Sequence, residues 1–131
     1  MKSKKLLLLV VGLVLGSMLL TACGKSTSAK PNFPTGKFEL STDEFRGIEF
    51  KDDGTWAAID IGEIIAQGTY SVKGDQYIEK SNDQDCPAPM SYQYTFDGTY
   101  LKFKLTDQSM KDTCQNRMNG FNNTTYILKT Q

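Results

Sequence analysis

Apolar and polar side chains alternate with a period of two along most of the chain from residue 36 onward. Ile48 and Phe50, for example, flank Glu49, and residues 99–106 repeat the pattern. Such alternation places one face of a strand in a core and the other in water. We predict eight strands, at residues 37–41, 46–51, 55–61, 65–73, 76–82, 91–96, 99–106 and 124–130. No window shows the period of an amphipathic helix, so an all-β domain is expected.

The connections between these strands fall into two kinds. Tight hairpin signals follow strands 2, 4 and 6, at Asp53-Gly54, Gly74-Asp75 and Asp97-Gly98. The connections after strands 1, 5 and 7 are predicted to be longer, the last spanning about residues 107–123, and only the one near Gly62 is short. In an up-and-down sheet alternate connections share an end. One end should therefore be tightly turned, and the other, the mouth, should carry the long loops.

Eight antiparallel strands expose two sheet edges unless the sheet closes on itself. We therefore predict one small up-and-down antiparallel barrel of about eight strands. An interior of this size is filled by side chains or holds one small ligand.

Three stretches carry a family resemblance. They are residues 48–56 (IEFKDDGTW), residues 68–72 (GTYSV) and a block from Cys86 through Tyr92, Tyr94 and Phe103 to Arg117. With these stretches the chain resembles small bacterial lipoproteins with a lipocalin-like (calycin) barrel, over nearly all of residues 36–131. The resemblance implies the fold and brings no settled activity with it.

The N-terminal segment has the pattern of an export signal. Lys2, Lys4 and Lys5 precede an apolar run over residues 6–20, which is shorter than the ~18 residues of a spanning helix. The run ends at Leu20-Thr21-Ala22-Cys23, which resembles the bacterial lipobox. We interpret residues 1–22 as a lipoprotein signal peptide. The alternative is a permanent membrane-anchor helix.

The lipobox resemblance implies cleavage before Cys23 and acylation of its thiol, with palmitate-type chains that anchor the protein in a membrane. Residues 23–35 then form the lipidated Cys and a flexible Lys/Ser/Thr/Pro-rich tether. Gly24 replaces the Asp that retains many lipoproteins at the inner membrane. The expected location is the extracytoplasmic side of the cell envelope: the outer membrane in a Gram-negative host, otherwise the outer face of the cytoplasmic membrane.

Composition excludes several function classes. The 131 residues suffice for one domain and include no histidine, which rules out His-dependent metal sites and catalytic triads. Without residues 1–22 the chain has 12 basic and 15 acidic residues, a net charge near −3, so nucleic acid is not an expected partner. The oxygen-rich residues 82–85 lack a calcium-loop pattern. We predict no enzyme activity, no cofactor and no metal site.

Two cysteines remain once Cys23 is lipidated. Cys86 and Cys114 fall in the loops after strands 5 and 7, both at the mouth, and an exported domain permits a disulfide. We predict that they are bridged rather than reduced. A loop of this length is worth about 3.5 kcal/mol in the chain-entropy model.

Several side chains are candidates for ligand contact. Trp56 and Tyr70, like Phe38, Phe50 and Tyr126, are placed to face inward, where they fill the core or line a pocket. Met90, Met110, Met118 and Phe121 lie in or beside the mouth loops, where they form an adaptable apolar surface or fold down as a plug around the disulfide.

Arg117 has two possible roles. It hydrogen-bonds loop carbonyls or an acid such as Asp112, or it meets an anionic ligand or partner.

Two function classes remain open. The leading one is a membrane-anchored module that binds a small apolar or amphipathic ligand in the barrel or at its mouth. The alternative is a protein–protein module, such as an envelope hydrolase inhibitor or a structural accessory, that uses loops 83–90 and 107–123. The tether is expected to enter at the tightly turned end, so that the mouth faces away from the membrane.

Overall fold

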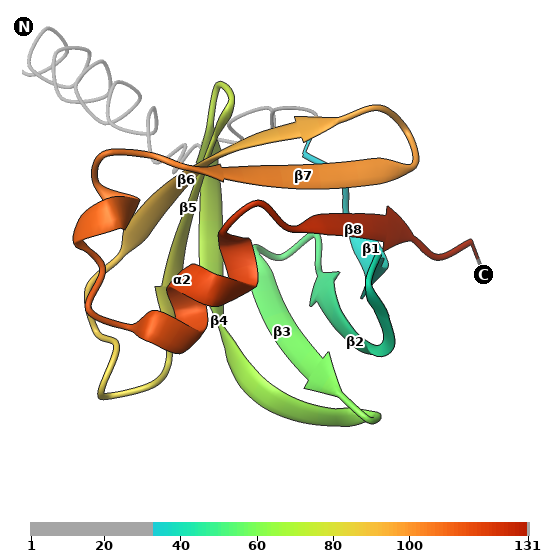
Figure 1. The fold of residues 1–131 in the computed structure, drawn as a ribbon, viewed down its shortest axis with the longest axis horizontal. Helices are drawn as coiled ribbons and strands as arrows, with labels where there is room; N and C mark the ends of the chain where they lie inside the picture. Colours follow the sequence, from blue (N-terminus) through green and yellow to red (C-terminus); the bar gives the residue numbers. More distant parts are fainter. Residues whose placement is uncertain (1–32, 131) are drawn as a thin grey trace, which may run out of the picture.

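The computed structural model describes residues 33–130, so the predicted signal peptide, Cys23 and most of the tether lie outside the described residues. The described chain forms a closed antiparallel barrel in which each strand pairs with its sequence neighbours and β8 pairs with β1 (Figure 1). The strands are β1 (Gly36–Leu40), β2 (Asp43–Phe50), β3 (Thr55–Asp60), β4 (Glu63–Lys73), β5 (Gln76–Ser81), β6 (Met90–Phe96), β7 (Tyr100–Leu105) and β8 (Thr125–Leu128). Two short helices, η1 (Ser109–Lys111) and α2 (Gln115–Phe121), lie between β7 and β8. The predicted all-β barrel with eight strands is confirmed.

The turns at one end follow the Asp and Gly positions of the sequence. Gly54, Gly74 and Gly98 all have positive φ values, of 84°, 62° and 100°. The carboxylate of Asp97 accepts hydrogen bonds from the backbone N–H groups of Thr99 and Tyr100, which lower the pKa of Asp97. These three connections define the closed end of the barrel.

The opposite end, the mouth, differs from the prediction in two ways. The connection between β1 and β2 is only Ser41–Thr42, because β2 begins three residues earlier than expected. The long connection before β8 is not a plain loop, because it contains η1 and α2. The absence of helix was therefore a wrong expectation. Seven residues are too few to display a helical stripe, and Gly120 within α2 weakens the propensity further.

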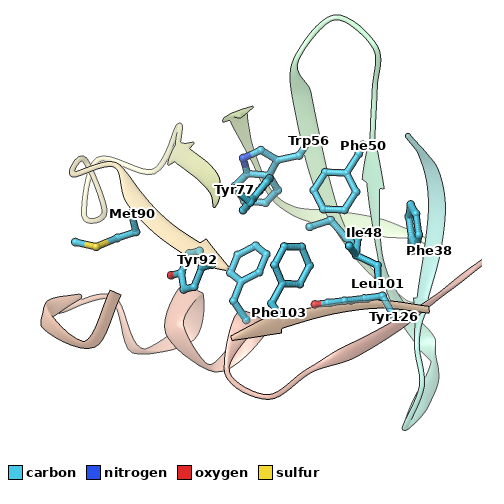
Figure 2. Close-up of a cluster of buried hydrophobic side chains, with 11 residues drawn as sticks. Phe38, Ile48, Phe50, Trp56, Tyr77, Met90, Tyr92, Leu101, Phe103 and Tyr126 are labelled. Atoms are coloured by element: carbon cyan, nitrogen blue, oxygen red, sulfur yellow. The ribbon is translucent and has the colours of Figure 1, made fainter. Parts of the chain in front are cut away.

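The barrel interior is filled largely with aromatic rings. Figure 2 shows side chains from opposite walls converging in this core, and Tyr77, Tyr92 and Leu101 have no exposed surface at all. At the closed end Phe33, in the segment predicted as tether, packs at 5.0 Å from Phe50 and 5.3 Å from Tyr77 (ring centroids). The packed domain thus includes residues that precede β1.

Candidate ligand pocket and buried ion network

The mouth half of the barrel contains a pocket of about 630 Å³ between strands β2–β4 and helix α2. Its buried lining is mostly apolar or aromatic and comprises Ile48, Trp56, Phe121 and Tyr126, with one buried polar residue, Ser81. Its exposed lining is mostly polar or charged and consists of Arg46, Asp83, Asn116 and Asn119, together with one apolar residue, Ile65. Small residues in the strand wall, Gly47, Ala58 and Ala66, leave room for the hollow.

Trp56 is held in the pocket wall by a glycine on the neighbouring strand. Trp56 pairs with Gly68, and a Cβ at Gly68 would lie 2.9 Å from the indole Nε1 and collide with the Lys80 carbonyl oxygen. Glycine is therefore required for the indole to lie against β4. The buried Nε1–H has no acceptor among the described residues. Most buried donors in proteins are satisfied, so this one is unusual.

Arg117, on α2, holds the mouth loops together. Its Nε and Nη2 donate to both oxygens of Asp112, at 2.6 and 2.8 Å, and its Nη1 donates to the carbonyls of Cys86 and Ala88, at 3.2 and 2.9 Å. Asp112 also accepts from the backbone N–H of Cys114 at 2.9 Å and from the hydroxyl of Tyr92 at 3.4 Å. Burial acts to raise the pKa of Asp112, but these hydrogen bonds and the Arg117 charge outweigh it and lower the pKa. The expectation that Arg117 bonds Asp112 and loop carbonyls is confirmed.

Glu79 is a second carboxylate in this network, and it is fully buried on the inner face of β5. Its Oε1 lies 3.0 Å from Nε of Arg117, but neither Glu79 oxygen accepts an aligned hydrogen bond from a described residue. Burial raises the pKa of Glu79 to about 7; Arg117 opposes this rise and Asp112 adds to it. The Arg117 guanidinium therefore faces two carboxylates, and it donates its hydrogen bonds to Asp112 rather than to Glu79.

The disulfide between Cys86 and Cys114 is present, with 5.8 Å between the two Cα atoms. Cys114 immediately precedes α2, and Cys86 lies in the β5–β6 loop. Phe121, at the other end of α2, inserts into the barrel with its ring centroid 4.6 Å from that of Tyr92 and 4.9 Å from that of Phe103. Helix α2 is thus fixed at both ends.

The structure brings together only some of the predicted ligand-contact residues. Trp56, Arg117 and Phe121 line the pocket. Tyr70 lies near the closed end, where its hydroxyl donates to the Lys51 carbonyl at 2.8 Å. Met90 is buried in the core.

The other two methionines lie outside the pocket lining. Met118 is half-buried, and Met110 is 68 % exposed. Of the four mouth side chains considered as a plug, Phe121 and Met90 are buried and Met110 is not.

Sequence reasoning missed Glu79, although a signal was present. One face of β5 carries Tyr77, Glu79 and Ser81, which are two residues apart along the strand. This face points into the barrel, because Tyr77 is buried. Charged side chains are so rarely buried without a partner that a Glu in a strand is normally read as solvent-facing. The partner, Arg117, is 38 positions away in sequence, so only the fold reveals the pair.

Two searches of residues 33–130 gave negative findings. No cluster of three or more His, Cys, Asp or Glu side chains in this range could hold a metal ion. None of the helices there has the length and apolar character needed to cross a membrane.

The chain matches no protein-family model, and neither curated proteins nor solved structures gave a significant match. The barrel itself is consistent with a lipocalin-like fold.

Proposed function

We propose that the protein is an exported, lipid-anchored envelope protein that binds one small apolar or amphipathic molecule in the mouth pocket. The observation that carries this proposal is the pocket itself, about 630 Å³ with a largely apolar buried lining and a largely polar exposed lining. Pockets that bind small molecules typically measure roughly 300–1,000 Å³ and combine apolar walls with a few polar groups.

The distribution of side chains suggests how such a ligand would lie. A hydrocarbon chain or ring would contact Ile48, Trp56 and Phe121, and a polar end group would meet Asn116 and Asn119 near solvent. The guanidinium of Arg117 already donates its hydrogen bonds to Asp112 and to the loop carbonyls. The proposed binding mode therefore does not use Arg117 as the partner of a negatively charged end group.

The proposed anchoring rests on the sequence. Residues 1–22 and Cys23 have the signal and lipobox pattern, and the described chain begins at Phe33, which packs at the closed end. An anchor before Phe33 would leave the mouth facing away from the membrane.

The decisive experiment uses Trp56, the only tryptophan of the chain, as a contact reporter. Purified protein, residues 24–131, is titrated with 9,10-dibromostearate, whose bromines quench an indole only on close approach. We expect saturable quenching, relieved by competing unbrominated stearate. Native mass spectrometry of the same preparation, purified without detergent, should show a bound mass that is lost on denaturation.

Two substitutions on β4 separate pocket binding from surface binding. Ala66→Phe fills the pocket wall and should weaken the apparent affinity at least about tenfold, which corresponds to about 1.4 kcal/mol. Thr69→Phe places the same ring at an exposed position of the same strand and should leave the affinity unchanged. Non-saturable quenching, or equal effects of both variants, would argue against a ligand in the pocket.

A further inference from the structure

Exposed apolar side chains gather at one place on the surface. Among residues 33–130 six large apolar side chains are exposed, and four of them lie at the β3–β4 turn and the adjoining start of β2. These four, the hairpin tip, are Phe45 (63 % exposed), Ile61 (78 %), Ile64 (62 %) and Ile65 (57 %). The N–H of Ile61 donates to the carbonyl of Phe45 at 2.9 Å, so the two segments are adjacent. Figure 1 shows the β3–β4 hairpin as a free projection at the bottom of the barrel.

The backbone at the hairpin tip is strained, because an isoleucine, Ile61, adopts a left-handed conformation there. Ile61 has φ 49° and Gly62 has φ 81°, the two consecutive left-handed positions of a type I′ turn. Asn or Gly normally occupies the first of these positions, and a β-branched residue there is an outlier. Ile61 costs stability through its backbone conformation and gains nothing by burial. The fold therefore gives no reason for an isoleucine at the turn.

The rim of the hairpin tip is acidic. Residues 43–46 and 60–65 include four acids, of which Glu44 and Glu63 are exposed, and a single base, Arg46. An acidic rim is repelled by an anionic lipid surface and complements a surface rich in Lys and Arg. An apolar centre with a charged rim is the ordinary anatomy of a protein–protein interface.

We propose that the hairpin tip docks into an apolar cleft, rimmed by Lys and Arg side chains, on another extracytoplasmic protein, with Ile61 as the central anchor. This interaction goes beyond ligand binding in the pocket and does not depend on it, although Ile65 of the hairpin tip also lines the pocket. It rests on the proposed function only in placing the protein outside the cytoplasm. It also uses a different surface from loops 83–90 and 107–123, where Arg117 is already committed to the buried network.

The test is site-specific photo-crosslinking of the full chain in the cells that produce it. The photoreactive residue p-benzoylphenylalanine replaces Ile64, and a matched control carries it at Thr69, which is exposed on the same strand. We expect an adduct with one protein from position 64 and none from position 69. The crosslinked peptide should map to an apolar cleft surrounded by Lys and Arg. Ile61→Asn, and separately the pair Glu44→Lys with Glu63→Lys, should reduce the adduct and weaken binding to the purified partner at least about 30-fold.

Ile61→Asn also provides the folding control. An Asn-Gly turn relieves the strained position, so the variant should melt roughly 4–8 °C higher than the parent. It should also retain the dibromostearate quenching, which separates this proposal from the pocket. A lower Tm for Ile61→Asn, an adduct with a second copy or with phospholipid, an adduct that survives Ile61→Asn, or no adduct at position 64 would each overturn the proposal.

Discussion

Glu79 and Arg117 meet inside the mouth of the barrel, with 3.0 Å between Oε1 and Nε and with side chains that are 0 % and 6 % exposed. Within residues 33–130 the aligned hydrogen bonds of Arg117 nevertheless go to Asp112 and to the Cys86 and Ala88 carbonyls. The contact thus joins β5 to α2 as a close ion pair in which neither Glu79 oxygen accepts an aligned hydrogen bond from a described residue. Two carboxylates and one guanidinium are buried together, so one negative charge has no cation of its own. Protonation is therefore favoured at Glu79, the carboxylate that accepts fewer hydrogen bonds.

This arrangement predicts an unusual dependence of stability on pH. The folded-state pKa of Glu79 is about 7, above its ordinary value of 4.5, so between these values the folded state holds a proton that the unfolded state has lost. The free energy of unfolding must therefore fall as pH rises through this window, with a slope up to about 1.4 kcal/mol per pH unit and a total on the order of 3 kcal/mol. The chain has no histidine to obscure the effect.

Urea denaturation at pH 5 to 8, followed by Trp56 fluorescence, measures this slope. Glu79→Gln keeps the shape of the side chain and removes its titration, so its curve should be nearly flat over the same range. Parallel curves for the parent and Glu79→Gln would show that another group causes the dependence.

Removing the cation should be far more damaging than removing Glu79. Arg117→Met leaves Asp112 and Glu79 buried without a counter-charge and leaves the Cys86 and Ala88 carbonyls without their donor. Losses of about 3–5 kcal/mol are typical when one partner of a buried pair is removed. Urea denaturation at pH 7 should show a loss of this size. Lys111→Met, an exposed cation close in sequence, should change stability by less than about 0.5 kcal/mol; equal effects would contradict the network.

The alternation of apolar and polar residues was sufficient to predict the barrel, because one face of each strand is buried. Burial of that face determines which residues of the strand must be apolar. Every predicted strand overlaps an observed one, with ends that agree within three residues. The β1–β2 connection was predicted too long because Phe45 and Arg46, with Asp43 and Glu44, do not alternate clearly, and the structure leaves Phe45 exposed. Strand ends outside the core are held by backbone pairing, which leaves little signal in the side chains.

The site was less predictable, because its parts depend on contacts distant in sequence. Helix α2 lacks an apolar stripe and is held by the Cys114 disulfide and by Arg117. The pocket depends on small residues such as Ala58 and Ala66, which carry no chemical signature. The pairing of Arg117 with Asp112 was predictable because the two lie five residues apart.

Loss of the disulfide should loosen the mouth before it unfolds the barrel. Cys86 and Cys114 are 28 positions apart, and the double substitution to Ser should reduce the free energy of unfolding by about 3.5 kcal/mol in the chain-entropy model. Hydrogen exchange should accelerate first in α2 and in residues 82–89, which the bridge connects, and least in β2 and β3. Uniform acceleration across the barrel would show that the bridge stabilises the whole domain rather than the mouth.

The proposed lipid anchor depends on one atom, the thiol of Cys23. In producing cells supplied with radiolabelled palmitate, the parent chain should take up label, lose residues 1–22 and fractionate with membranes. Cys23→Ser should take up none and keep its N-terminal segment, because serine cannot form the thioether on which cleavage depends. Cys86→Ser with Cys114→Ser should still be labelled, which excludes acylation of the other two thiols. Label that persists in Cys23→Ser, or a parent chain that is unlabelled and intact at its N-terminus, would instead favour the permanent anchor helix.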